Sequence, residues 1–456
     1  MLSRLKSFTL IQLVVLVGVL FGPAFFAIDG FIQFSLDRVL LFSVIALVAA
    51  RLVRGADTLP TFTRLDALII ALTAVCFVSA ARFGLFEGEP PPVARWLFFM
   101  AFPLAGYLVT RVSRLEDGDV RRMIHGIIGL GVYLSVMAVC EIKGLHALVF
   151  PRFIVDPEVW EFYGRGRGPL LNPAGNGILM TTALAACTTR FFHSGRHAKA
   201  LYGVLGLVCL AGVYATLTRS VWLGAVTAVA LISLKYMPRW FRVLSLACVV
   251  LLAGAMAMGL KDQILNIKRD KNLSAAEAAK SIELRPLLAL VAYEMFLDRP
   301  ILGHGYGHYV DAAEPYHSIR RHGVPLEKVR PYIQHNVFLS QVADNGMVGL
   351  SLLVLVLISA GLSAWRLADS PPDRIQHRSA GHIAIGCLCG YTINGLFHEV
   401  GVIEMVHLTL FFSVGVTFNL LQQAKAIVEP RHARTRRTDA MPIATTINAP
   451  MPTTAP

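Results

Sequence analysis

Charged residues are scarce in this sequence. Only 16% of its 456 residues are Asp, Glu, Lys or Arg, whereas 55% are apolar. A soluble domain carries about 25% charged residues, so this chain lacks the charge to cover the surfaces of soluble domains. The formal net charge of +13 would suit nucleic acid or anionic lipid. The basic residues, however, lie between apolar runs or at their ends, where they orient membrane helices. Nucleic-acid binding therefore loses its main support.

Cysteine motifs are absent as well. All seven cysteines fall in apolar runs and none belongs to a C-x-x-C pair, which excludes disulfides in the polar loops and zinc knuckles. Asp117-Gly-Asp119 has the D-x-D form of some metal-dependent enzymes, but we interpret it as a turn. His304 and His308 flank glycines that break the helix needed to align them. We therefore expect no metal and no cofactor.

Long apolar runs are what the sequence has in abundance. Their length approaches the ~20 residues that a helix needs to cross about 30 Å of hydrocarbon. The sequence therefore predicts an all-α, polytopic membrane protein with about twelve transmembrane helices. The predicted spans are 8–27, 36–53, 66–82, 94–112, 122–142, 173–192, 198–217, 220–237, 241–260, 347–367, 380–397 and 403–423.

The segments between the spans give the orientation and the domains. Lys and Arg concentrate in the short connections of one side, which predicts that both termini are cytoplasmic. Two long loops, 143–172 and 261–335, then lie outside, and capping-box spacing predicts helix between 275 and 298 in the second. We divide the chain into a transmembrane domain over 1–423 and a disordered cytoplasmic tail over 424–456, whose basic half can touch anionic lipid.

His335 is the first candidate for chemistry. It stands directly before Asn336, where a helix is predicted to start. The positive end of a helix dipole favours neutral imidazole, which can accept a proton as a general base. The alternative is a histidine that makes one hydrogen bond at the membrane interface.

Four arginines are candidates for binding an anion. Arg219 lies in a short outer connection between two spans, where a charge is costly without a partner such as phosphate; alternatively, it reaches the lipid headgroups. Arg285, on the predicted loop helix, either reaches over the membrane site or is an ordinary solvated charge. Arg165 and Arg167 stand in a Gly- and Pro-rich turn, whose exposed N–H groups would favour an anion, or which is simply the entry turn of a span.

Carboxylates inside the predicted spans are few. Proton- and sodium-coupled transporters carry ionisable residues inside their spans, and the sequence shows almost none there. Several arginines and one base on the outer face instead suit a lipid-linked phosphate or diphosphate.

Taken in order, these motifs resemble the O-antigen ligase-like (Wzy C-terminal-domain type) membrane family. The family includes O-antigen ligases, polymerases of O-antigen and exopolysaccharide, and some protein O-oligosaccharyltransferases. The last motif resembles the family's H-[NSQ]-x9-G signature without a spacing error. The matching pieces are Arg165-x-x-Gly168, Asn172-Pro173, Gly177, Thr216-x-Thr218-Arg219, Arg285, Pro300-x-x-Gly303-x-Gly305 and His335-Asn336-x9-Gly346.

The resemblance implies a GT-C-type fold in a bacterial inner membrane, with a periplasmic active site. It also implies a metal-independent transfer of glycan from undecaprenyl diphosphate to an acceptor hydroxyl, on lipid A–core or on a growing glycan. Arg219 and Arg285 would bind the diphosphate, and His335 would activate the acceptor. Arg165, Arg167 and Asn336 are further substrate-binding candidates.

Two questions stay open at this point. The motifs are shared by ligases and polymerases, so they do not separate the two. The rival class is a small-solute or anion transporter of similar membrane architecture.

Overall fold

A computed structural model describes residues 6–22, 24–26, 28, 35–88, 90–240, 242–243, 275–330 and 332–438, with the backbone alone for 275–283 and 425–438. Within these ranges the chain forms helices and no strand, and a helix coincides with eleven of the twelve predicted spans. The run 241–260 lies almost wholly outside the described residues. The helices are α1 (Ser7–Phe21), α2 (Leu36–Val53), α3 (Arg64–Ala81), α4 (Pro92–Trp96), the π-helix η2 (Leu97–Ala101), α5 (Phe102–Val112), α6 (Asp117–Ile142), α7 (Pro173–His193), α8 (Arg196–Ala215), α9 (Arg219–Leu234), α12 (Ala275–Asp298), α14 (Val337–Ala368), α15 (Ile375–Gly395) and α16 (Glu404–Thr438).

Among the described helices, six are long and apolar enough to cross a membrane. They include α3, α6, α8 and α14, whereas α1 and α9 are apolar but shorter. The number of twelve spans therefore stays a prediction, while the all-helical membrane character of the chain agrees with the sequence.

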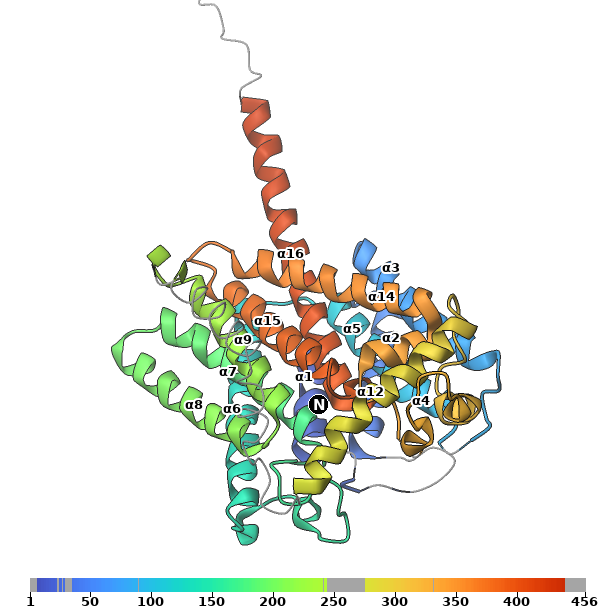
Figure 1. The fold of residues 1–456 in the computed structure, drawn as a ribbon. Helices are drawn as coiled ribbons and strands as arrows, with labels where there is room; N and C mark the ends of the chain where they lie inside the picture. Colours follow the sequence, from blue (N-terminus) through green and yellow to red (C-terminus); the bar gives the residue numbers. More distant parts are fainter. Residues whose placement is uncertain are drawn as a thin grey trace, which may run out of the picture.

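The bundle is built around α7, α15 and α16 (Figure 1). Helix α15 packs against α7, α9, α14 and α16. In the spanning stretch of α16 89% of the residues are buried, against 28% in α8, so α16 is central and α8 peripheral. Small residues permit the close approach: a Cβ on Gly131 of α6 would lie 2.0 Å from the Cβ of Ala183 in α7. Such small-residue contacts are typical of helix packing in membranes.

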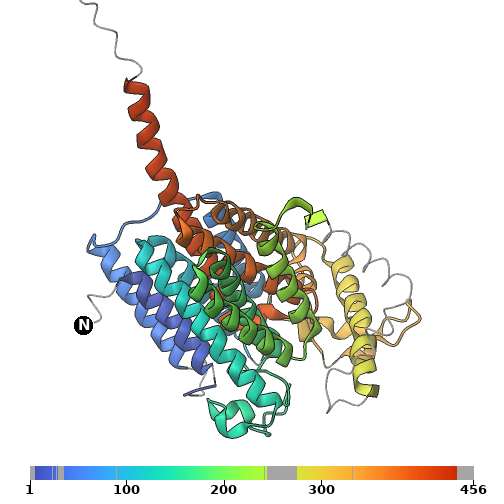
Figure 2. The same ribbon diagram turned by 90° about the vertical axis from the view of Figure 1, so that its left-hand side faces the viewer.

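Helix α12 stands beside the bundle, at the right of Figure 2. Its buried side chains, among them Leu288, Val291 and Met295, pack with Leu326 and Val329 in a small apolar core of their own. This confirms the helix predicted in the large loop, as one helix with Pro286 inside it. Helix α16 runs out of the bundle as far as Thr438 (Figure 1), beyond residue 424, where the sequence predicts disorder.

The expectation that the spans hold almost no buried carboxylates is wrong. Asp66 pairs with Arg111 over 2.9 Å, and Glu404 pairs with Arg38 over the same distance. These carboxylates stand at the ends of apolar runs, where partners from helices distant in sequence enclose them. The scarcity of carboxylates therefore no longer argues against a transporter. The buried carboxylates of the helices include Asp37, Asp66, Glu141, Asp344 and Glu404.

Candidate active site

Three helix N-termini meet around the C-terminal end of α15. The start of α7 touches the start of α9, since a Cβ on Gly177 would lie 2.3 Å from Val221. The first half of α9 packs on the end of α15, where Gly224 faces Asn394, and the first residue of α14 packs on Gly395. The positive ends of three helix dipoles therefore gather at one place, which favours an anion there.

The residue that precedes each of these three N-caps is left-handed. Leu171, Leu217 and His335 have φ angles of 51°, 49° and 50°. Side chains other than glycine adopt this conformation at a cost of about 1–3 kcal/mol, and such strain clusters at functional sites. Sequence reasoning found the three motifs separately, but it missed this shared backbone geometry because no glycine stands at these positions to signal a left-handed turn.

Asn336 fixes the turn that carries His335. As predicted, the helix starts here: Asn336 is the N-cap of α14, and its Oδ1 accepts from the N–H groups of Phe338 and Leu339 at 2.8 and 3.1 Å. Its Nδ2 donates to the carbonyl of Leu396 at 3.0 Å, just after α15. One side chain thus ties the His335 turn to both α14 and the end of α15.

Arg285 lies over the same place from α12. Its guanidinium carbon is 5.8 Å from the ring centre of Phe397. The side chain of His335 is solvent-accessible, but surrounding protein atoms and the positive charge of Arg285 lower its pKa below the ordinary value. The structure therefore brings together His335 and Arg285, and it favours the neutral imidazole that a general base requires.

The glycines of two motifs, Gly303 after α12 and Gly346 in α14, lie where the loop packs on the helix. Gly346 breaks the regular backbone of α14 with a φ of 62°, and a Cβ there would lie 2.4 Å from the carbonyl of Ile301. Gly303 has a φ of 61° and packs on Asp344 in the same way. The N–H of Met347 donates to Pro300 O at 2.8 Å. The loop that follows α12 therefore locks onto the kink of α14, and this holds Arg285 and His335 in one body.

Arg219 is the first residue of α9 and is half-buried. It belongs to the gathered N-termini through α9 itself, whose first half packs on α15. Arg165 reaches the same turn from the loop 143–172. Its Nη2 donates to Thr218 Oγ1 at 2.6 Å, and its Nε donates to Thr216 O at 3.4 Å. Arg165 is thus joined to the residues directly before Arg219.

Arg167 is placed differently from the other arginines. It is fully buried, and its guanidinium donates to the loop carbonyls of Ile154, Asp156, Val159 and Glu161. Burial lowers its pKa. This geometry gives Arg167 the role of organising the loop 143–172.

The backbone of the same turn also departs from the expectation of exposed N–H groups. The N–H groups of Arg167 and Gly168 both donate to the carboxylate of Glu141 at 3.1 Å. They therefore face the end of α6. The sequence could not predict these hydrogen bonds, because Glu141 has the position of an ordinary polar residue at the end of a span.

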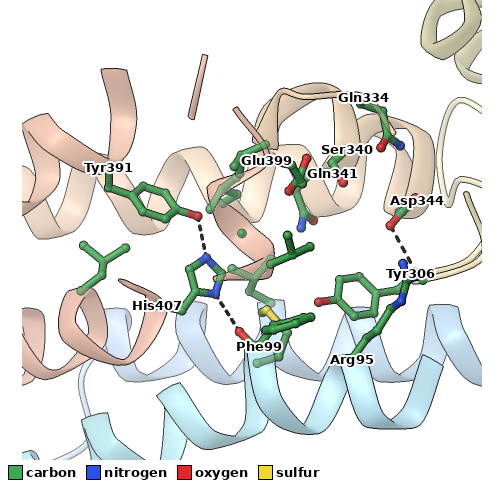
Figure 3. A pocket seen from close by; sticks show the side chains of 18 of the residues that line it. Arg95, Phe99, Tyr306, Gln334, Ser340, Gln341, Asp344, Tyr391, Glu399 and His407 are labelled. Atoms are coloured by element: carbon green, nitrogen blue, oxygen red, sulfur yellow. Dashed lines mark hydrogen bonds between the residues drawn. The ribbon is translucent and has the colours of Figure 1, made fainter. Parts of the chain in front are cut away.

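A small cavity into which several polar side chains point lies beside Gln334, the residue before His335 (Figure 3). Its volume is about 60 Å³, well below the roughly 300 Å³ of small ligand pockets. Gln334 and Val337, on either side of His335 and Asn336, line it, so the cavity adjoins the His335 turn from within the bundle. The polar groups that line it include Arg95, Tyr306, Gln341, Asp344, Glu399 and His407.

Two networks organise this cavity, as Figure 3 shows. Nδ1 of His407 donates to Phe99 O, and its Nε2 faces Tyr391 OH, both at 2.7 Å. Phe99 lies in the π-helix η2, and π-helical turns are frequent near functional sites. The N–H of Gly307 donates to Asp344. Burial, and then the charge of Asp344, raise the pKa of Glu399 to about 8, so this carboxyl is largely protonated at neutral pH.

In the described part of the chain, no three His, Cys, Asp or Glu side chains gather as metal ligands would. Three helix N-termini gather at the end of α15 instead; Arg219 begins one of these helices, and Arg285 lies beside His335. Arginine pairs bidentately with phosphate oxygens. The fold and this site define an all-helical membrane protein in which helix α12 of the large loop lies over a cluster of helix N-termini with Arg285 and His335 beside them.

The comparison with known families agrees with this class. The family model described as O-antigen ligase matches residues 204–354, a stretch that includes Arg219, Arg285 and His335. Over this stretch, about a third of the chain, the sequence is similar to that family, which supports an O-antigen ligase-like membrane protein of glycan-transferring type. Arg165 and Arg167 lie outside the matched stretch. A search among curated proteins found no match.

Proposed function

We propose that this protein is a glycosyltransferase of the periplasmic face, which moves a glycan from undecaprenyl diphosphate to an acceptor hydroxyl. The observation that carries the proposal is the placement of His335 beside Arg285, with Asn336 tied to the end of α15, against which α9 also packs. The family match over 204–354 supports the same reaction class.

The proposed chemistry divides between the arginines and the histidine. Arg219 and Arg285 neutralise the diphosphate, so that it leaves with the electron pair of its bond to the sugar C1, without a metal ion. Neutral His335 takes the proton of the acceptor hydroxyl as that oxygen attacks C1 from the opposite face. The products are a glycosidic bond with inverted configuration, undecaprenyl diphosphate and a protonated His335.

Reconstitution tests this proposal directly. The full-length protein in vesicles would receive an undecaprenyl-diphosphate-linked glycan and an acceptor, and the glycosylated product would be measured. We expect His335→Ala to abolish transfer while donor binding persists, and Arg219→Ala to weaken donor binding. Full transfer by the His335 variant, or unchanged donor binding by the Arg219 variant, would refute the assigned roles.

The nature of the acceptor needs a separate experiment. Loss of the polymer in a deletion strain would indicate a polymerase, whereas normal polymer retained on undecaprenyl diphosphate would indicate a ligase onto lipid A–core. Vesicles also test the rival class: solute or anion flux without any transfer would show a transporter.

A further inference from the structure

The three converging helices differ in how their first turns are capped. Asn172 at α7 accepts from two backbone N–H groups at 3.0 Å, those of Ala174 and Gly175. Asn336 at α14 makes the same pair of bonds. Thr218 is the N-cap of α9, but its side chain makes no capping hydrogen bond. The helix that begins with Arg219 is thus the exception among the three.

The hydroxyl of Thr218 is engaged elsewhere. It donates to Thr216 O at 2.9 Å and accepts from Nη2 of Arg165 at 2.6 Å. Arg165 is itself buried, and its Nε donates to the same carbonyl of Thr216. The next side chain, Ser220, is only 7% exposed, and among the described residues its Oγ has no hydrogen-bond partner. The first turn of α9 therefore holds a buried hydroxyl and an N-cap turned away from the helix.

We propose that Arg165 is a positioning residue: by occupying the hydroxyl of Thr218, it keeps this side chain from capping α9 and leaves the first turn of the helix to the donor's diphosphate beside Arg219. The inference rests on the proposed function, because it assigns the diphosphate to Arg219. Backbone N–H groups at a helix N-terminus bind phosphate oxygens well, and a side-chain cap competes for those groups.

Thr218→Asn is the informative variant. Asparagine is a strong N-cap, as Asn172 and Asn336 illustrate, so the variant should cap α9 and raise the Tm. It should also weaken binding of geranylgeranyl diphosphate, a probe for the diphosphate subsite, by about five- to tenfold. Thr63→Asn is the matched control: Thr63 already caps α3, so binding should not change. Thr218→Ser keeps the hydroxyl and should bind as the wild type does.

Arg165→Gln separates positioning from direct contact. It should lower the Tm, because buried hydrogen bonds are lost, and it should weaken probe binding because Thr218 becomes free to cap α9. In the Thr218→Asn background the same change should have little further effect on binding. Calorimetric titration of the purified full-length variants measures the probe affinity in both backgrounds.

Two results would overturn the inference. One is a Thr218→Asn protein with a raised Tm and wild-type affinity for the probe. The other is an Arg165→Gln effect on affinity that is fully additive with Thr218→Asn, which would indicate direct contact with the donor. If either result occurs, Arg219→Ala shows which proposal fails. Normal probe binding by Arg219→Ala would refute the proposed function as well, whereas weak binding would leave the proposed function standing and refute only the positioning role of Arg165.

Discussion

The side-chain amide of Asn336 donates to the carbonyl of Leu396 at 3.0 Å while its oxygen caps α14. The two bonds have different consequences. The cap stabilises the helix, whereas the bond to Leu396 holds the His335 turn against the end of α15. Substitutions can separate the two.

Asn336→Ala should lose both functions, and Asn336→Ser should lose only the bond to Leu396, because serine is also a good N-cap but does not carry the amide. We expect Asn336→Ala to lower the free energy of unfolding by about 1 kcal/mol, and Asn336→Ser to change it little. Both should transfer glycan more slowly, since His335 is held less firmly. Thermal unfolding and initial rates measure the two effects, and a wild-type rate in Asn336→Ser would contradict the role of the bond.

The pH dependence of transfer should report His335 and its neighbour Arg285. The pKa of His335 lies below its ordinary value because of the surrounding protein atoms and the charge of Arg285. Activity should therefore fall only as the pH drops below about 6.5, where the imidazole becomes protonated. Removing the positive charge with Arg285→Gln favours the protonated ring and should move this acidic limb to higher pH.

A pH–rate profile at saturating donor checks the effect of Arg285. An acidic limb that keeps its position in Arg285→Gln would show that the two side chains are not electrostatically coupled in the working protein. Arg299→Gln is a suitable control, because Arg299 follows α12 and packs over Phe83.

Phe397 should support Arg285. Its ring centre is 5.8 Å from the guanidinium carbon, and such contacts contribute about 0.5–1 kcal/mol at accessible sites. Phe397→Ala should weaken donor binding by about two- to fivefold, while Phe397→Tyr keeps the ring and should bind normally. Titration with donor compares them, and equal affinities in the alanine and tyrosine variants would exclude the ring from this role.

Glu399 should make stability depend on pH. Its pKa is raised to about 8, so the folded state binds this proton more tightly than the unfolded state does. The resulting stabilisation is complete below the unfolded pKa of about 4.3 and is lost as the pH rises toward 8. Glu399→Gln cannot ionise, so its Tm should fall less between pH 5 and about 8 than that of the wild type.

Melting curves across this pH range test the prediction for Glu399. Glu327→Gln, on the 3₁₀ turn η7 (Leu326–Val329), is the matched exposed control and should follow the wild-type curve. Parallel wild-type and Glu399→Gln curves would show that the carboxyl does not retain its proton on folding.

The helices and the motif residues could be predicted from the sequence because both depend on local patterns. Apolar runs of spanning length, the asparagine at the start of α14 and the capping signal near residue 275 all gave helices close to those observed. The role of each arginine could not be predicted. Arg165 and Arg167 are two residues apart in one turn, yet one joins the Thr218 turn and the other binds carbonyls of its own loop.

By itself, the sequence determined an all-helical membrane chain and the ordered motifs around Arg219, Arg285 and His335. Hydropathy and helix signals act over neighbouring residues, so they can be interpreted without the fold. Only the tertiary structure decided that Gly303 packs against Asp344 beside the kink at Gly346, that Asn336 is bound to Leu396, and that a small cavity lined by Glu399 adjoins the His335 turn. These contacts join segments distant in sequence, and no local pattern specifies which of them meet when the helices pack.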